Sequence, residues 1–230
     1  MKKNIICLLL ILAYSCNYPE MIRDEIIYNN NFENNNLENI DGAKIKNFND
    51  TNVVGNFNND GFTIHLNEIG NHDYLHLSFD LYIHGTWDGN FNGFTNGDKP
   101  DLWMIEFNPQ MDLFQDENSD IFVTTFSNSP CFSNYCLRQS YPDSYPSENT
   151  PKISAFEVGL EKICKNSFFG GETTLYKIEK IFKSSGKSAI IRFSDQLYQP
   201  NAIDKDGNDQ QKCDESWSLD NLIIRAIEYQ

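Results

Sequence analysis

Residues 74–84 constrain the fold of this chain more than any other segment. They read Tyr-Leu-His-Leu-Ser-Phe-Asp-Leu-Tyr-Ile-His, and every second side chain from Leu75 to Ile83 is apolar. Successive side chains of a strand point to opposite faces, so this period of two predicts one long strand with a buried face and an outer face. The outer face carries Tyr74, His76, Ser78, Asp80, Tyr82 and His84.

Shorter apolar runs, separated by turn residues, follow along the rest of the chain. The expected strands are residues 61–66, 102–107, 121–126, 174–182, 188–193 and 218–228. Gly, Asn and Asp, which favour turns, are frequent between them, as in 58–61, 85–101 and 204–214. No segment of useful length has the 3.6-residue period of an amphipathic helix. We therefore expect an all-β fold, an antiparallel β-sandwich of jelly-roll type in a single domain.

The first fifteen residues have the three parts of a secretory signal. Two lysines stand at the start, residues 5–13 are apolar, and the small residue Ser15 precedes Cys16. The apolar run is shorter than the roughly 20 residues that span a bilayer. We therefore expect the remainder of the chain to be exported.

The segment Ala13-Tyr14-Ser15-Cys16 resembles the lipobox of bacterial lipoproteins, with Ala13 and Tyr14 in place of the usual leucine and small residue. The resemblance implies cleavage before Cys16 and fatty-acyl chains, palmitate among them, on that cysteine. Asn17 differs from the Asp of an inner-membrane retention signal, so the expected location is the outer membrane. The expected parts are a leader (1–15), a lipid anchor and tether (16–30) and the sandwich (31–230). The alternatives are an ordinary signal peptide with an incidental cysteine and a buried N-terminal strand.

The chain is strongly acidic. Its formal net charge of −15 becomes −17 after cleavage, because Lys2 and Lys3 leave with the signal. This charge disfavours nucleic acid and anionic membrane surfaces as partners. It is compatible with bound divalent cations, although a solubilising surface charge needs no ligand.

Four cysteines remain beyond Cys16, namely Cys131, Cys136, Cys164 and Cys213. In an oxidising compartment an even number of cysteines predicts two disulfides. Of the three possible connectivities we favour Cys131–Cys136, which closes a tight loop, and Cys164–Cys213, which joins distant segments. A zinc site is the competing interpretation, but no CxxC pair or neighbouring histidine supports it.

Five segments together resemble a jelly-roll module of bacterial and protist surface proteins, similar in style to carbohydrate-binding modules and concanavalin A-like sandwiches. These segments are 77–90, 99–103, 124–128, 139–142 and 214–222. Thr86, Lys99 and Ser218 stand where the usual pattern has one serine and two glycines. The resemblance covers roughly residues 32–228. It implies the fold and leaves the function open, because such sandwiches host many activities.

Three places are candidates for calcium. Asn31-Phe32-Glu33 and residues 219–222 resemble the terminal strands of calcium-containing jelly-roll carbohydrate modules, which implies that Glu33 and Asp220 hold a structural ion. The loop 87–101 offers oxygen ligands from Asp88, Asn90, Asn92, Asn96, Asp98 and Asp101. The acidic turn 204–209 is the weakest candidate. In each place ordinary surface or turn chemistry is the alternative.

The three tryptophans, Trp87, Trp103 and Trp217, offer flat faces on which sugar rings stack. Trp103 lies in an alternating apolar strand, so we expect it in the core. Trp87 follows the long strand where a loop begins, which makes it the best exposed candidate. The predicted ligand-binding set is Trp87, Asp88, Asn90, Tyr82 and His84. For the last two residues a concave binding sheet and burial beneath a covering loop both stay open.

Catalysis has little support in the sequence. The Glu-x-Asp-x-x-Glu strand typical of jelly-roll glucanases is absent, as are Gly-x-Ser-x-Gly and His-Glu-x-x-His motifs. We therefore expect a non-enzymatic, lipid-anchored surface protein that binds a glycan or a cell-surface protein and no nucleic acid. A secreted glycoside hydrolase on the same fold and a purely structural surface protein are the alternatives.

Overall fold

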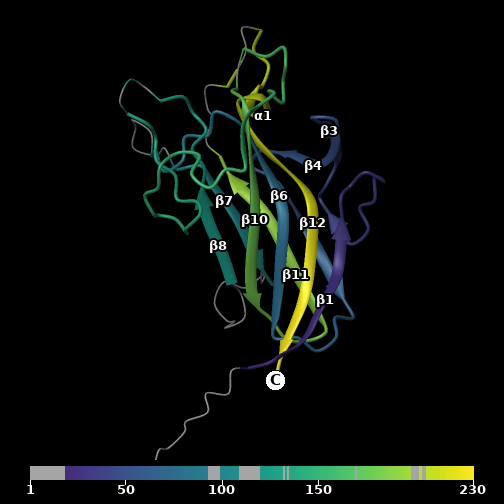
Figure 1. The fold of residues 1–230 in the computed structure, drawn as a ribbon. Coiled ribbons are helices and arrows are strands. Elements are labelled where there is room, and N and C mark those ends of the chain that lie inside the picture. Colours follow the sequence, from purple (N-terminus) through teal and green to yellow (C-terminus); the bar gives the residue numbers. More distant parts are fainter. Residues whose placement is uncertain are drawn as a thin grey trace, which may run out of the picture.

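The computed structural model describes residues 19–92, 99–108, 120–131, 133, 135–168, 170–197, 202–203 and 206–230. Two antiparallel β-sheets pack face to face in these residues (Figure 1). Cys16 lies outside the described residues, and so do Asn96 and Asp98 of the predicted calcium loop. Within the described part, no helix has the length and apolar character needed to cross a bilayer.

The larger sheet has seven strands. In spatial order they are β3 (Ile45–Phe48), β4 (Thr51–Phe57), β12 (Glu215–Tyr229), β6 (Tyr74–Gly85), β10 (Thr173–Lys183) and β9 (Glu157–Leu160), with β1 (Met21–Asn30) also paired to β12. Strands β4 and β1 occupy the same edge of β12 in succession. The first pairs with residues 217–219 and the second with residues 222–229.

The smaller sheet has five strands. In spatial order they are β2 (Ile40–Asp41), β5 (Gly61–Asn67), β11 (Ser188–Gln196), β7 (Leu102–Phe107) and β8 (Asp120–Thr125). The one helix in the described residues is α1 (Gln211–Asp214), a single turn before β12. Because β4, β5, β6 and β7 alternate between the sheets, the connections cross the sandwich repeatedly. The predicted antiparallel sandwich of jelly-roll type is confirmed.

The long alternating strand forms the centre of the core, as predicted. Its five apolar side chains, from Leu75 to Ile83 in β6, are no more than 3% exposed. They pack against the facing sheet, where Phe79 meets the ring of Phe193 edge-on at 5.4 Å between centroids. Trp103 is fully buried, which confirms its predicted place in the core. Each such side chain stabilises the fold by about 1.5–3 kcal/mol.

The segment that enters β1 and the end of β12 meet at one end of the sandwich. Glu20 and Gln230 exchange backbone hydrogen bonds of 3.3 and 2.9 Å, and Met21 lies opposite Tyr229. We call this end, formed by Glu20–Ile22 and Glu228–Gln230, the base. The opposite end, which we call the far end, carries α1 and the surrounding loops (Figure 1).

The predicted boundary between tether and sandwich was wrong. Residues 21–30 were expected to belong to the tether, but they form β1 and pair with β12 from Met21 to Asn30. Two irregularities in register, at 21–23 and 26–28, prevent the period of two from showing in the sequence of this polar edge strand. Only residues 17–20 therefore lie between Cys16 and the first strand.

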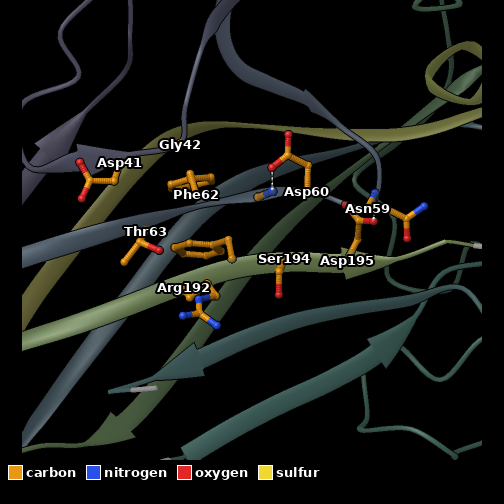
Figure 2. Close-up of a pocket in the computed structure, with 11 residues that line it drawn as sticks. Asp41, Gly42, Asn59, Asp60, Phe62, Thr63, Arg192, Ser194 and Asp195 are labelled. Carbon is orange, nitrogen blue, oxygen red and sulfur yellow. Dashed lines mark hydrogen bonds between the residues drawn. The ribbon is translucent and has the colours of Figure 1, made fainter. Parts of the chain in front are cut away.

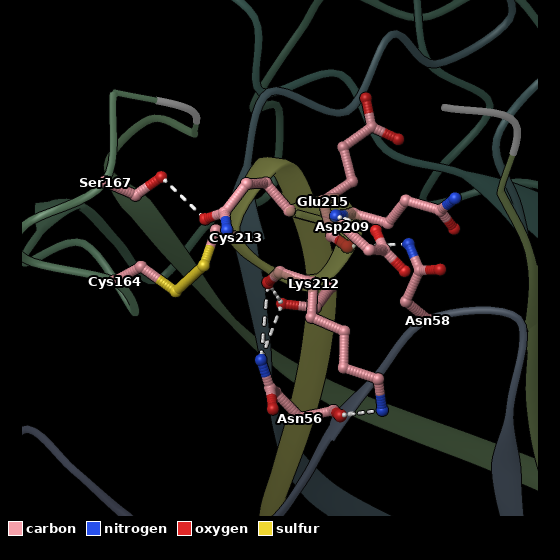
Figure 3. Close-up of a disulfide and its surroundings, with 11 residues drawn as sticks. Asn56, Asn58, Cys164, Ser167, Asp209, Lys212, Cys213 and Glu215 are labelled. Atoms are coloured by element: carbon pink, nitrogen blue, oxygen red, sulfur yellow. Dashed lines mark hydrogen bonds between the residues drawn. A yellow bond between two sulfur atoms is a disulfide. The ribbon is translucent and has the colours of Figure 1, made fainter. Parts of the chain in front are cut away.

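Both predicted disulfides are present. Cys131–Cys136 closes a tight loop, and Cys164–Cys213 joins the segment after β9 to α1 (Figure 3). Polar contacts with the end of β4 hold α1 in addition: the Lys212 ammonium donates to the Asn56 carbonyl at 3.0 Å, and the Asn56 amide donates back to the Lys212 carbonyl at 3.3 Å. The far end is thus fastened by both covalent and polar links.

Candidate functional site

Trp87 does not form an exposed platform, and this prediction was wrong. Its side chain is fully buried, and its indole N–H donates to the backbone carbonyl of Ser216 at 3.0 Å. The ring also meets Phe126 edge-on at 6.2 Å between centroids. Trp217 is likewise fully buried. Stacking on a sugar ring requires an accessible aromatic face, so neither residue can serve that purpose.

Asp88 and Asp101 hold the loop that follows β6. The carboxylate of Asp101 accepts the backbone N–H of Asp88 at 2.6 Å, and the carboxylate of Asp88 accepts the hydroxyl of Ser129, also at 2.6 Å. Burial raises the pKa of Asp88 above its ordinary value. These contacts are the turn chemistry weighed as the alternative to calcium, and calcium at this loop stays a prediction.

The side chain of Asn90 likewise makes its hydrogen bonds within the protein. Its amide N–H donates to the Ser147 carbonyl at 2.7 Å, while its oxygen accepts the hydroxyls of Thr125 and Ser140 at 2.5 and 2.8 Å. With every polar atom of the side chain in use, Asn90 links β8 to the loop 139–147. The predicted ligand-binding role therefore gains no support from its surroundings.

Tyr82 and His84 lie beneath a cover, which was the second of the two interpretations left open. Tyr82 is 6% exposed and His84 is fully buried, and Phe48 of β3 packs edge-on against both rings. The His84 ring nitrogens lie 2.9 Å from the hydroxyls of Thr173 and Ser218. Burial lowers the pKa of His84 to about 3, so the ring is neutral near pH 7. These two side chains cannot line an open binding sheet.

Glu33 and Asp220 come together, as the resemblance to calcium-containing modules implied. The Thr51 hydroxyl lies 2.5 Å from a Glu33 carboxylate oxygen and 3.2 Å from an Asp220 carboxylate oxygen. Burial raises the pKa of Asp220 to about 6. Asp80, opposite Asp220 on β6, is paired with the Lys177 ammonium at 2.8 Å. Among the described residues, no group of three or more His, Cys, Asp or Glu is arranged to hold a metal ion.

A pocket of about 380 Å³ opens on the outer face of the five-stranded sheet, on the half nearer the far end (Figure 2). Strands β2, β5 and β11 and the turn before β5 surround it. Besides Asp195, the polar side chains in its lining are Asp41, Asn59, Asp60, Thr63, Arg192 and Ser194. Phe62 and Phe193 are buried in the core, so alternation turns Thr63, Arg192 and Ser194 to the outer face.

Ionisable side chains border this pocket on two sides. Asp41 lies 3.0 Å from the His65 ring, and the Arg192 guanidinium lies 3.4 Å from Glu106, across the pairing of β11 with β7. The Arg192 side chain is 49% exposed and the Asp41 side chain 81% exposed. The pocket therefore offers an accessible cationic donor, the Arg192 guanidinium, and an accessible anionic acceptor, the Asp41 carboxylate.

Asp195 also adjoins the pocket, but its carboxylate faces the core. One oxygen accepts the Trp217 indole N–H at 2.6 Å and the other accepts the backbone N–H of Asn59 at 2.5 Å. Burial raises the pKa of Asp195 to about 6, and these hydrogen bonds act in the opposite direction. Figure 2 shows Asp195 turned toward Asn59 and Ser194 to the other side of β11. Asp195 thus anchors the turn that shapes one pocket wall.

A second, larger hollow of about 740 Å³ lies at the base. The loops 68–72 and 185–187 and Glu228 surround it. His72 is held there by the Gly70 carbonyl and the Ser184 hydroxyl, each 2.8 Å from a ring nitrogen. This histidine fastens two neighbouring loops to each other.

The sequence did not indicate the pocket residues as a group. Thr63 and Arg192 occupy outward positions of predicted strands, and that alternation was the one available signal. Their proximity follows from the pairing of β5 with β11, in which Thr63 lies directly opposite Arg192. Strands so distant in the chain cannot be paired from a single sequence.

Neither the family models nor the curated proteins searched contain a match to this chain. Among solved structures, the chain is similar to the enzymatically active domain of tailspike protein 4 from bacteriophage CBA120, with a TM-score of 0.36 and 12% identity. That alignment covers 90% of this chain and 21% of the tailspike chain.

Proposed function

We propose that this chain is an exported, lipid-anchored surface protein that binds a glycan without transforming it. The observation that carries the proposal is the pocket on the outer face of the five-stranded sheet, with the accessible side chains of Asp41, Asp60, Thr63, Arg192 and Ser194 in its lining. Cys16 is the proposed site of the lipid. The proposed ligand site is therefore this pocket and not the loop after β6, where Trp87 is buried.

The polarity of the pocket favours a neutral, oxygen-rich ligand. Carboxylates accept hydrogen bonds, guanidinium groups donate them, and Thr and Ser hydroxyls do both. Adjacent sugar hydroxyls need both kinds of partner within a few ångströms. A phosphate or sulfate would meet the carboxylates of Asp41 and Asp60 as well as Arg192, which disfavours a strongly anionic ligand.

The position of the pocket supports the same choice. The hollow near Glu228 lies at the base, where the chain leaves toward Cys16. A protein anchored through Cys16 turns its base toward the membrane. The pocket near the start of β5 lies on the opposite half of the molecule and meets external ligands first.

Hydrolysis is the weaker alternative. A glycosidase needs two carboxyl groups that reach the scissile bond from opposite sides. Asp60 and Asp195 both adjoin the pocket, and the raised pKa of Asp195 suits an acid. However, both oxygens of Asp195 already accept protein N–H groups on the core side of β11. This arrangement favours a structural role for Asp195.

Calcium remains part of the proposal as a structural ion beside Glu33 and Asp220. Two carboxylates within reach of one hydroxyl, that of Thr51, are the support for it. Calcium takes six to eight oxygen ligands, of which these side chains would provide two. The ion would fasten the segment after β1 to the middle of β12.

A glycan array probed with the chain beginning at Cys16 tests the binding role. Arg192→Ala should reduce retention of the bound glycans at least about tenfold, the loss expected for a charge-assisted hydrogen bond. Arg138→Ala is the matched control, because Arg138 is exposed and lies outside the pocket lining. Absence of any enriched glycan, or equal retention by both variants, would refute the proposed site.

A further inference from the structure

The distance between the proposed anchor and the sandwich is short. Four residues, 17–20, separate Cys16 from Met21, the first residue of β1. One extended residue spans at most about 3.3–3.6 Å, so less than about 20 Å of chain joins the Cys16 sulfur to the base. A lipid on Cys16 would therefore keep the base within about 20 Å of the membrane surface.

The base exposes large apolar side chains. Met21 is 48% exposed, Ile22 is 51% exposed and Tyr229, opposite Met21, is 37% exposed. Apolar side chains at a membrane surface bury themselves at the boundary of headgroups and acyl chains. Tyrosine is enriched at the same depth, because its ring is apolar and its hydroxyl stays in contact with polar groups.

Charge indicates which bilayer the base fits. Glu20 and Glu228 belong to the base, and the chain that begins at Cys16 carries a formal net charge of −17. This net acidity disfavours electrostatic attraction to anionic lipids as the source of contact. The attraction between the base and a bilayer would then come from the apolar side chains, which suit a bilayer with zwitterionic headgroups.

We propose that the base is a membrane-contacting surface, in which Met21, Ile22 and Tyr229 insert among the headgroups of a zwitterionic bilayer. This inference rests on the proposed anchor at Cys16. It adds a defined orientation, because a contact at the base turns the far end away from the membrane. The pocket beside Gly61 then faces outward, since the strand pairing places Gly61 at the end of β5 remote from the base.

Fluorescence quenching by brominated lipids tests the orientation. All described strands lie after Glu20, so the chain beginning at Cys16 can be coupled through that thiol to a maleimide lipid in phosphatidylcholine vesicles. Tyr229→Trp places an indole in the base. Phe156→Trp places one at the far end beside β9, where Phe156 is 63% exposed. The three native tryptophans are fully buried and provide a constant background.

Brominated lipid should remove about half of the emission added by Tyr229→Trp, because an indole at headgroup depth lies near the bromines. Emission added by Phe156→Trp should stay unchanged. Adding Ile22→Glu to Tyr229→Trp should restore most of the lost emission. Equal quenching at both positions, no quenching at Tyr229→Trp, or quenching insensitive to Ile22→Glu would each overturn the membrane-contacting surface.

The anchor itself is tested in separate material. The chain is produced with residues 1–15 in a bacterium, and the mass of its N-terminal peptide is measured. A peptide that begins at Cys16 without lipid would refute the anchor. Because the vesicle experiment uses chemical coupling, its result would still decide whether the base contacts a bilayer.

Discussion

The outer faces of the two sheets differ in how much of each is covered. On the seven-stranded sheet, the half near the far end lies beneath Phe48 and the segment after β9, so that Tyr82 and His84 are buried. On the five-stranded sheet, Thr63 and Arg192 in the corresponding half border an open pocket. Identical alternation in a strand can therefore lead to a second small core or to an open pocket.

The difference arises from the loops. The second core consists of Phe48, Val53, Tyr82 and Leu175, with Leu160 and Ile163 packed against it. Ile163 is adjacent to Cys164, whose disulfide to Cys213 fastens this cover. The strands alone do not distinguish a covered face from an open one, because the covering residues come from distant parts of the chain.

The largest loss of stability is expected when the cover over Tyr82 and His84 is released. Cys164→Ser with Cys213→Ser removes a link across 49 residues, and loop-closure entropy predicts a loss of about 4 kcal/mol in the free energy of unfolding. Cys131→Ser with Cys136→Ser is the control, with about 2 kcal/mol expected for a separation of 5 residues. Urea unfolding measures both. A smaller loss for the first pair would contradict the view that this disulfide holds the cover.

The second effect compares two histidines on the same face of β6. His84→Ala should cost about 3 kcal/mol, because it leaves a cavity and removes the partner of the Thr173 and Ser218 hydroxyls. His76→Ala should cost less than about 1 kcal/mol, since His76 is partly exposed and lies 3.5 Å from the exposed Glu179. Thermal unfolding of both variants measures the two losses of stability and checks their ratio. Similar losses would mean that the cover does not protect His84.

The third effect concerns the carboxyl group behind the open face. The folded pKa of Asp195 is raised to about 6 from 3.8, so the stability that its proton confers is fully present below pH 3.8. It is lost as the pH rises through about 6. Asp195→Asn removes this pH-dependent loss of stability, because the amide does not ionise. Between pH 4 and pH 7 the stability of the variant relative to wild type should rise by an amount on the order of 2 kcal/mol.

Urea unfolding at several pH values measures that difference. Asp220, whose pKa is also raised to about 6, titrates in the same range, and comparison with wild type at each pH cancels its contribution. A difference that is constant with pH would show that burial does not raise the pKa of Asp195.

The fourth effect concerns calcium. With calcium a few-fold above its dissociation constant, the free energy of unfolding should rise by about 1 kcal/mol by mass action. Glu33→Gln should abolish the rise, because it removes a ligand charge beside Asp220. Melting curves in calcium and in EGTA provide the measurement. Identical curves for wild type in both solutions would refute the ion.

The smallest effect on stability is expected at the open pocket. Arg192→Ala removes an exposed ion pair of 3.4 Å with Glu106 and should change stability by less than about 0.5 kcal/mol. The same variant is expected to lose glycan retention. A large loss of stability would indicate that Arg192 is a structural residue.

The sequence predicted the fold better than it predicted the site. Period-two alternation located β6 and the neighbouring buried strands, and turn residues separated them. It missed β1, whose polar residues and irregular register hide the alternation, and it also missed β2, β3, β4 and β9. Trp87 was misplaced because its burial depends on Ser216, a partner supplied by β12. The resemblance implied that Glu33 and Asp220 share a calcium ion; the two side chains do share a contact with Thr51, and the ion stays a prediction.

The pairing of Glu20 with Gln230 has a consequence for handling the protein. Because the start of β1 and the end of β12 are neighbours, a short linker could join them, and new termini could be opened in an exposed far-end turn such as residues 206–208. Conversely, a bulky reporter fused after Gln230 would occupy the base. On an anchored molecule it would act as a wedge against the bilayer, so fluorescent fusions at that position would tilt the domain that they are meant to display.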